Sequence, residues 1–286
     1  MPFTANDLLN AVGDALALPE TCQRVNQMAG DERYSAADIA EVIRLDPGLT
    51  TRLLKIANSP FFGFPSHIDS VPRAITVIGT EELRQLVLAT SVVNMFSNLP
   101  NELVSMETFW RHSLRCAVIA RTIAAFLKEP EVEHYFTAGL LHDIGYLVIY
   151  RELPELAEKA QEHCAQNRGI VYIVEQEIIG FDHAKVGAEL LRRWNLPPAQ
   201  VEAVACHHTP SLARQFPREA AIIHVANYLA NTMLSNLSPT LEPTEALDMQ
   251  AMEQIGLSPD DLQILLRKAE QQFTDTLNIL VYDQVA

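Results

Sequence analysis

The sequence contains one dipeptide that sets an imidazole beside a carboxylate inside an apolar run. His142 and Asp143 are flanked by Leu140-Leu141 and Ile144-Gly145, and apolar residues continue to Ile149. Burying an ionised carboxylate without a partner costs several kcal/mol. A metal ion would supply the opposite charge and would also use the neighbouring imidazole. A structural, hydrogen-bonded His–Asp pair within a helix is the alternative reading of this dipeptide.

Four further histidines strengthen the metal reading by their placement. His112, His183 and the doublet His207-His208 lie in or beside aliphatic, helix-patterned sequence, where a surface histidine would be out of place. Adjacent helical residues point about 100° apart because a turn holds about 3.6 residues. Both histidines of the doublet can therefore reach one metal cluster only at a helix end or across two ions. We expect one site to collect the following residues: His112, His142, Asp143, His183, His207 and His208.

The order of these residues resembles the HD superfamily of metal-dependent phosphohydrolases. Within it the sequence is most similar to the HDOD branch, which is related to the HD-GYP phosphodiesterases. The resemblance covers roughly residues 15–235, and many phrases match in one order. These phrases are Ile43-Arg44-Leu45-Asp46-Pro47-Gly48-Leu49, Lys55-Ile56-Ala57-Asn58-Ser59, Ala74-Ile75-Thr76-Val77-Ile78-Gly79, Gly139-Leu140-Leu141-His142-Asp143-Ile144-Gly145 and Leu191-Arg192-Arg193-Trp194-Asn195-Leu196-Pro197.

The resemblance implies a role for each candidate residue. His142 and Asp143 match the catalytic HD pair, whose aspartate bridges metals that generate a hydroxide and hold phosphate oxygens. The remaining histidines match further metal ligands, and Asn227 stands at the position of the final aspartate ligand. The implied metal-binding set is His112, His142, Asp143, His183, His207, His208 and Asn227.

Four departures from the enzyme pattern bear on activity. Asn227 replaces an aspartate, and Thr108 stands where the trinuclear enzymes have a glutamate ligand. Thr209-Pro210 follows the doublet in place of a Gly-Tyr-Pro phrase, and Tyr146 replaces a lysine that often follows the HD pair. The imidazole set is thus whole and the carboxylate set is depleted. Such a site could hold one or two divalent transition metals, Fe, Mn, Zn or Ni, and suits a trinuclear cluster poorly.

The charge of the chain excludes several classes of partner. The 286 residues carry 21 basic and 36 acidic side chains, a net charge of −15. A nucleic-acid binder clusters its Lys and Arg residues against phosphates, and no such cluster is visible. The helices expected over residues 46–95 could resemble a helix-turn-helix, but Arg84 is matched by Glu81 and Glu82, which removes the basic face of a recognition helix. We predict no nucleic-acid partner and no membrane surface.

The cysteines and the apolar pattern predict a cytoplasmic protein. The four cysteines are scattered without a C-x-x-C pair, which indicates a reducing compartment. Cys206, beside the doublet, could be a ligand, although a small buried thiol is the simpler reading. We find no signal-peptide pattern and no run of about 18 apolar residues.

The periodicity of the apolar residues predicts an all-α fold. The resemblance implies that the helices form an HD-domain-like helical bundle with an additional N-terminal helical lobe. Asp46-Pro47 is a helix start. Residues 59–65 form a loop, Pro100 and Asn101 break the chain, and Pro130 ends a helix before another that carries His142 and Asp143. Residues 236–244 read as a linker before an amphipathic helix from Pro259. The expected parts are 1–100 (HDOD-specific lobe), 101–235 (HD-like domain) and 236–286 (linker and C-terminal helices).

Two functions compete. The first is a bacterial signalling module that acts through protein partners and keeps a vestigial or partial HD metal site. It is favoured by the resemblance and by the lost carboxylates. The second is a metal-dependent phosphohydrolase acting on a small phosphoester, a nucleotide or a cyclic dinucleotide, and it is favoured by the intact six-residue set. The sequence leaves the oligomeric state, the metal and the signal open.

Overall fold

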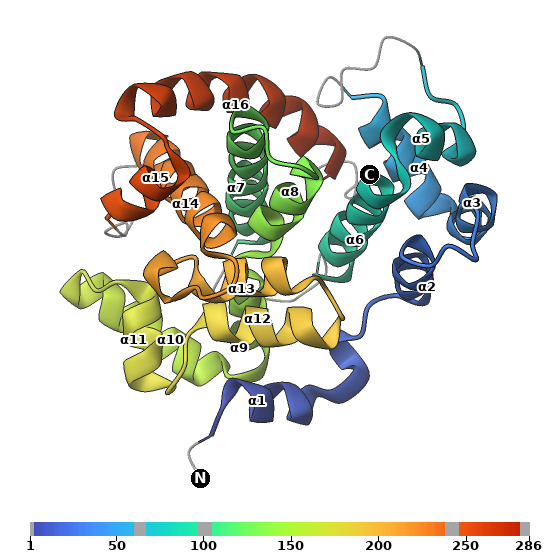
Figure 1. The fold of residues 1–286 in the computed structure, drawn as a ribbon. Coiled ribbons are helices and arrows are strands. Elements are labelled where there is room, and N and C mark those ends of the chain that lie inside the picture. The colour runs from blue at the N-terminus through green and yellow to red at the C-terminus, as the bar shows by residue number, and fades with distance from the viewer. Residues whose placement is uncertain (1–2, 60–66, 97–104, 238–245, 281–286) are drawn as a thin grey trace. The chain divides into compact units, whose positions relative to one another are not determined.

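The chain folds into α-helices and short 3-10 turns (Figure 1). The computed structural model describes residues 3–59, 67–96, 105–237 and 246–280, and no β-strand occurs in these ranges. The all-α prediction is therefore confirmed. No helix in the described part of the chain is long and apolar enough to cross a membrane.

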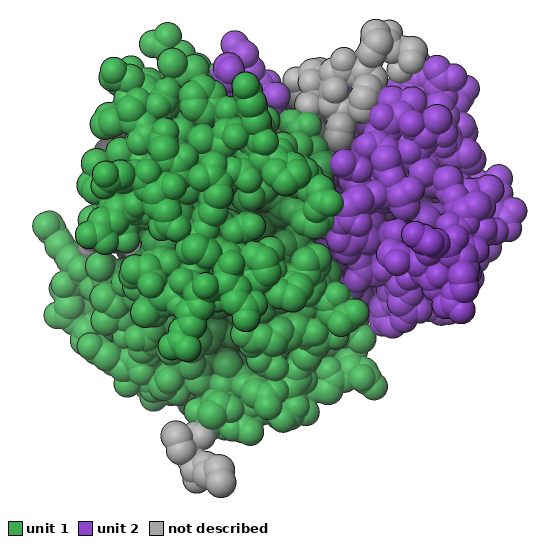
Figure 2. Space-filling view, viewed as in Figure 1, with its two compact units in different colours: residues 1–17, 99–267 green, residues 18–98, 268–286 purple. Residues whose placement is uncertain are grey.

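The helices group into two compact units, shown in two colours in Figure 2. The first unit comprises residues 1–17 and 99–267, and the second comprises residues 18–98 and 268–286. The last helix, α16 (Pro259–Leu280), begins in the first unit and ends in the second. The division at residues 100 and 235 expected from the sequence stays a prediction.

The first unit contains the HD pair and is built on two long helices. α7 packs along α8 and α14, while α12 packs against α9, α13 and α1. Its elements are α1 (Ala5–Val12), η1 (Gly13–Leu16), α7 (Met106–Phe126), α8 (Val132–Leu141), α9 (Ile144–Glu152), α10 (Pro154–Asn167), α11 (Val171–Ile178), α12 (His183–Arg193), α13 (Pro198–Cys206), η2 (Pro210–Leu212), α14 (Pro217–Leu237) and α15 (Met249–Ile255).

A glycine allows α7 and α8 to approach closely. A Cβ built on Gly139 of α8 would lie 2.8 Å from the Ala117 Cα and 3.0 Å from the Cys116 carbonyl oxygen, both in the backbone of α7. The two helices therefore meet backbone to backbone, three residues before His142. This contact sets the distance between the α7 side chains and the HD pair.

The second unit is a smaller helical group. Its helices are α2 (Glu20–Ala29), α3 (Ala36–Arg44), α4 (Pro47–Ala57), α5 (Val71–Ile78) and α6 (Thr80–Phe96), with residues 268–280 of α16. The predicted start at Asp46 is confirmed, since its carboxylate accepts a hydrogen bond from the Leu49 N–H at 2.9 Å. Arg84 is buried and its Nε donates to Glu81 at 2.8 Å, so its guanidinium is already paired with a carboxylate inside the unit.

Some expectations fall on residues outside the described ranges. These are residues 60–65 of the expected loop, the break at Pro100 and Asn101, and residues 238–244 of the expected linker. Asn236 and Leu237, assigned to that linker from the sequence, instead belong to the end of α14. Ser59 is buried and its hydroxyl donates to the Ile56 carbonyl at 2.7 Å.

Candidate metal centre

The HD pair lies at a junction between helices. α8 ends at Leu141, His142 is its C-cap, and Asp143 is the N-cap of α9. His142 Nδ1 donates to the Gly139 carbonyl at 2.7 Å, which satisfies one of the free carbonyls at the helix end. His142 Nε2 is then left 3.0 Å from Asp143 Oδ2. The expectation that one helix carries both residues was wrong, because His142 closes one helix before Asp143 opens the next.

The histidine doublet repeats this arrangement at the end of α13. His207 is the C-cap, and its Nδ1 donates to the Val204 carbonyl at 2.8 Å. His207 Nε2 is buried without a hydrogen-bond partner and lies 3.5 Å from Asp143 Oδ1. The doublet therefore lies at a helix end, one of the two positions that the sequence allowed.

His183 reaches the same carboxylate from the start of α12. Its Nε2 lies 3.3 Å from Asp143 Oδ1 and 2.8 Å from His208 Nε2. Its Nδ1 lies 2.7 Å from Glu175 Oε2, which also accepts the His183 backbone N–H at 2.8 Å. Glu175 thus fixes both the ring and the backbone of His183.

His112 completes the cluster from α7. Its Nε2 lies 3.4 Å from Asp143 Oδ2 and 3.3 Å from His142 Nε2. The two oxygens of Asp143 therefore face two groups, His112 with His142 on one side and His183 with His207 on the other, and His208 joins the second group. Within each group the candidate ligand atoms lie within 4.8 Å of one another. The structure brings together all six residues of the expected set.

The donor atoms of this cluster fit a divalent metal. His142, His183 and His207 each use Nδ1 to donate to a carbonyl or carboxylate, which turns their Nε2 atoms inward, as in proteins whose histidines bind metal. The buried His207 Nε2, which makes no hydrogen bond, is the atom that a metal would satisfy. Imidazole nitrogen with one carboxylate suits Zn, Fe, Mn or Ni. The residues present therefore fit such an ion.

Burial, neighbouring charges and hydrogen bonds together shift the pKa values of Asp143, His183 and His207. Burial opposes ionisation of Asp143, but His142 and hydrogen bonds from His112 and His183 hold the pKa of Asp143 well below its usual range. Burial also opposes the charge on His183, yet Glu175 and Asp143 raise the pKa of His183 to about 10. Burial lowers the pKa of His207 to about 4, and repulsion from the other histidines adds to this shift. Two negative carboxylates thus face protonated histidines that a metal would deprotonate on binding.

His142 and His208 shift in opposite directions. Burial disfavours protonation of His142, but the adjacent Asp143 carboxylate outweighs it and raises the pKa of His142 well above its usual value. Burial, followed by repulsion from His207 and His183, lowers the pKa of His208. The cluster therefore separates protonated rings from neutral rings that are ready to donate a lone pair.

Three other residues considered from the sequence make different contacts. Asn227, on α14, is buried, and its Oδ1 accepts a hydrogen bond from Asn231 Nδ2 at 3.1 Å. Thr108 is exposed in the first turn of α7, where its N–H donates to Ser105 Oγ. Cys206 is half-buried and belongs to neither ligand group. In the described part of the chain, no hydrogen bond joins these side chains to the six residues.

Sequence reasoning missed Glu175 and Tyr172 and understated Tyr146. Tyr146 stacks on the His183 ring at a centroid distance of 3.7 Å, and Tyr172 stacks on His208 at 4.3 Å. Glu175 is 3% exposed, whereas the nearby Glu177 is exposed. A signal existed, because Glu175 falls on the apolar face of α11 that the spacing of Val171, Val174 and Ile178 defines.

Replacing Glu175 with glutamine should loosen the candidate metal ligand His183. The Gln side chain keeps the size of Glu but removes the charge that holds His183 Nδ1–H, and such changes typically weaken metal binding about 10- to 100-fold. We expect a loss in this range for Zn²⁺, measured by competition with a chelator. Glu177→Gln removes the same charge from an exposed position two residues away and should leave the affinity unchanged. Equal affinities of both variants would contradict the role of Glu175.

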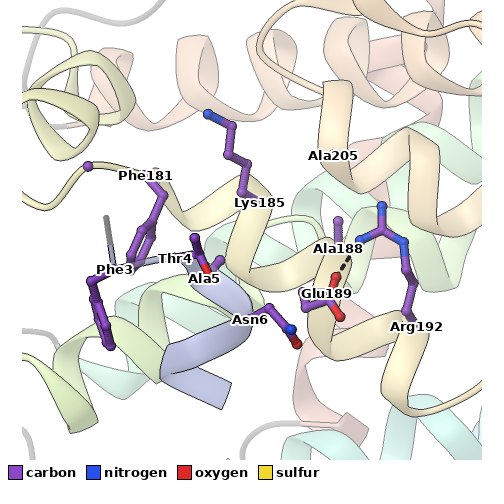
Figure 3. Close-up of a pocket in the computed structure, with 11 residues that line it drawn as sticks. Phe3, Thr4, Ala5, Asn6, Phe181, Lys185, Ala188, Glu189, Arg192 and Ala205 are labelled. Atoms are coloured by element: carbon purple, nitrogen blue, oxygen red, sulfur yellow. Dashed lines mark hydrogen bonds and ion pairs between the residues drawn. The ribbon is translucent and has the colours of Figure 1, made fainter. Parts of the chain in front are cut away.

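A separate pocket of about 360 Å³ lies on the outer side of α12 (Figure 3). Lys185, Ala188, Glu189 and Arg192 line it from one face of α12, opposite α1, and Arg192 pairs with Glu189 at 2.6 Å. None of the six cluster residues lines this pocket. α12 thus presents His183 to the cluster and a different face to the pocket.

The chain belongs to the HDOD family, since the HDOD domain matches residues 16–210, more than half of its length. A protein of Treponema pallidum (strain Nichols) without a characterised function is 24% identical over 205 residues, which are 71% of this chain and 39% of that protein. The chain spans well under half the length of the curated relatives it matches.

Solved structures share this fold. A candidate phosphohydrolase from Shewanella amazonensis SB2B superposes with a TM-score of 0.76 at 26% identity, covering 96% of this chain and 98% of that one. An HDOD domain protein of unknown function from Geobacter sulfurreducens gives 0.70 at 21% identity, covering 98% and 94%. The second likeness shows the fold alone.

Proposed function

We propose that this HDOD chain is a bacterial cytoplasmic signalling module that acts through protein partners and whose His–Asp cluster holds a divalent metal without hydrolysing phosphoesters. The observation that carries the proposal is the four-ligand group formed by Asp143, His183, His207 and His208. A tetrahedral ion held by four protein ligands has no open position, and closed sites of this kind are structural, whereas catalytic sites keep one position free.

The depleted carboxylates support the same proposal. Phosphoryl transfer with two metals needs both ions held while they stabilise the attacking and leaving oxygens. The His112–His142–Asp143 group offers three protein ligands, and Asn227, which stands where a further carboxylate would be, is hydrogen-bonded to Asn231. The net charge of −15 also disfavours an anionic substrate. When bound, the metal would supply positive charge to Asp143 and a fixed geometry to its ligands.

One observation favours the alternative, a metal-dependent phosphohydrolase. The two oxygens of Asp143 face separate ligand groups, as an aspartate that bridges two ions would. The Shewanella amazonensis protein that shares the fold at 26% identity is described as a candidate phosphohydrolase. Under this alternative His142 and Asp143 would be the catalytic pair, and a nucleotide or cyclic dinucleotide the substrate.

Metal analysis of the purified protein combined with a phosphodiester assay separates the two functions. We expect bound Zn, Fe, Mn or Ni at one or two ions per chain, and little or no turnover of cyclic dinucleotides or generic phosphodiesters. Metal-free protein after purification and after titration with each of these ions would contradict metal binding. Robust metal-dependent hydrolysis that Asp143→Ala abolishes would overturn the proposal and establish the alternative.

Asn227→Asp should raise the metal affinity. The substitution restores a carboxylate at the position of the missing ligand and adds a negative charge, which we expect to tighten binding of Mn²⁺ or Zn²⁺ on the order of tenfold, about 1.4 kcal/mol. Isothermal titration gives the affinity directly. Gln166→Glu adds the same charge at an exposed position on α10 and serves as the matched control. An equal gain in both variants would mean that only bulk charge changed.

A further inference from the structure

A buried histidine outside the cluster bridges a metal-ligand residue and the helix that follows. His224, on α14, is 2% exposed and belongs to neither ligand group. Its Nδ1 lies 2.8 Å from the His207 carbonyl oxygen, and its Nε2 lies 2.9 Å from the Asp248 backbone nitrogen. The ring thus connects two backbone groups that are 41 positions apart in the chain (248 − 207).

The two partners fix the state of this ring. A carbonyl only accepts and a backbone N–H only donates, so His224 carries its proton on Nδ1 and accepts at Nε2. The bonds therefore run in one direction, from the Asp248 N–H to His224 and from His224 to the His207 carbonyl. His207 in turn donates from Nδ1 to the Val204 carbonyl and presents Nε2 toward Asp143.

The same Asp248 also begins α15. Its side chain accepts hydrogen bonds from the N–H groups of Gln250 at 2.8 Å and Ala251 at 3.2 Å. Ala251, Met252 and Ile255 are buried, and α15 packs against α14. The packing of α15 on α14 and the bond to His224 therefore depend on one another, because a shift of the start of α15 also shifts the Asp248 N–H that His224 accepts.

We propose that α15 regulates the metal centre through His224. This inference rests on the proposed metal binding of the cluster. When α15 is seated, the Asp248 N–H holds His224 against the His207 carbonyl and keeps the ligand ring aligned. When a partner or a mutation displaces α15, His224 loses this donor, the end of α13 loosens, and the metal is held less tightly. Because linkage is reciprocal, a bound metal must also favour the seated helix.

A merely structural histidine makes a different prediction. If His224 only fills and satisfies a buried space, breaking its bond to Asp248 lowers the melting temperature but leaves the metal affinity of the folded protein unchanged. If His224 is a positioning residue, the affinity falls as well. Metal affinity of the folded chain therefore distinguishes the two roles.

The test compares Asp248→Pro with Asp248→Ala in the full chain. Asp248 has a φ of −73°, which proline adopts without strain. Both variants lose the side-chain cap of α15, and only proline also removes the N–H that His224 accepts. We expect Zn²⁺ affinity, measured by chelator competition, to fall about tenfold in Asp248→Pro relative to Asp248→Ala. Zinc should also slow hydrogen exchange over Met252–Ile255 in the wild type, and much less in Asp248→Pro.

Each outcome decides one of the two claims. Equal zinc affinities of the two variants, with a wild type that binds zinc, would overturn the role of α15 and leave the metal site intact. A wild type that binds no zinc would overturn the proposed metal function. In that case the ¹⁵N resonances of the His207 ring in the metal-free protein test the connection, and identical resonances in Asp248→Pro and Asp248→Ala would overturn it.

Discussion

Gly145→Ala is expected to push α12 away from α9 and to take His183 out of the cluster. A Cβ on Gly145 would lie 2.0 Å from the His183 carbonyl oxygen and 2.7 Å from the Gly187 nitrogen. Both atoms belong to the backbone, so no side-chain rotation relieves the overlap. Overpacking of this kind costs typically about 1–3 kcal/mol and more where the backbone must shift. We expect about 3 kcal/mol of lost stability in urea denaturation, together with lost metal binding.

Gly30→Ala is the matched control. Nothing lies within 4 Å of a Cβ built on Gly30, and its φ of −94° is ordinary for alanine. This substitution should leave the metal affinity unchanged and stabilise the chain slightly, by about 0.4–1 kcal/mol, because it restricts the unfolded state. If Gly145→Ala matched this control in stability and in metal content, the close approach of α9 to the start of α12 would not be a feature of the protein.

Asp143→Ala is expected to have the second large effect. Four imidazole Nε2 atoms, of His112, His142, His183 and His207, lie between 3.0 and 3.5 Å from its carboxylate oxygens. Alanine would leave the protonated histidines without their central counter-charge and would remove the residue shared by both ligand groups. Removing one member of a buried charged set costs about 3–5 kcal/mol. We expect a lower melting temperature, no bound metal, or both.

Lys128→Ala controls for the loss of a charged side chain. Lys128 is exposed just beyond α7. Its φ of 59° is about equally unfavourable for lysine and for alanine, so the substitution leaves the backbone strain unchanged. We expect wild-type melting temperature and metal content in this variant. Should Asp143→Ala behave identically to Lys128→Ala in both measurements, the cluster could not be a metal site.

The cluster was visible in the sequence because its residues break an apolar pattern. An imidazole among buried aliphatic residues needs a partner, and the resemblance to the HD superfamily indicated which six residues share one site. Helix starts such as Asp46-Pro47 were equally readable, since both residues act locally. Features that depend on neighbouring residues, such as a helix N-cap, can therefore be predicted from the sequence.

The remaining features depend on groups far away in the sequence. The break between His142 and Asp143 carries no proline, and the apolar run continues through it, so periodicity alone predicts an unbroken helix. Asn227 was matched by position to a ligand, but position does not say that its side chain bonds Asn231. Arg193 bonds Asn6, and Trp194 Nε1 donates to the Leu16 carbonyl. These bonds hold the N-terminal elements α1 and η1 against the end of α12, and each joins residues that lie far apart in the sequence.

The Nδ1 bonds of His142, His183 and His207 have a consequence for ion selectivity. Rotating any of these rings would take its Nδ1 donor away from a buried carbonyl or carboxylate, which costs about 1–3 kcal/mol. The Nε2 atoms of the three rings are therefore held at fixed separations. A rigid, nitrogen-rich set of donors would disfavour Ca²⁺, which binds six to eight oxygens at longer distances, and would favour the smaller transition metals. Any selectivity of the site between ions would then be set by the ends of α8 and α13 and the start of α12.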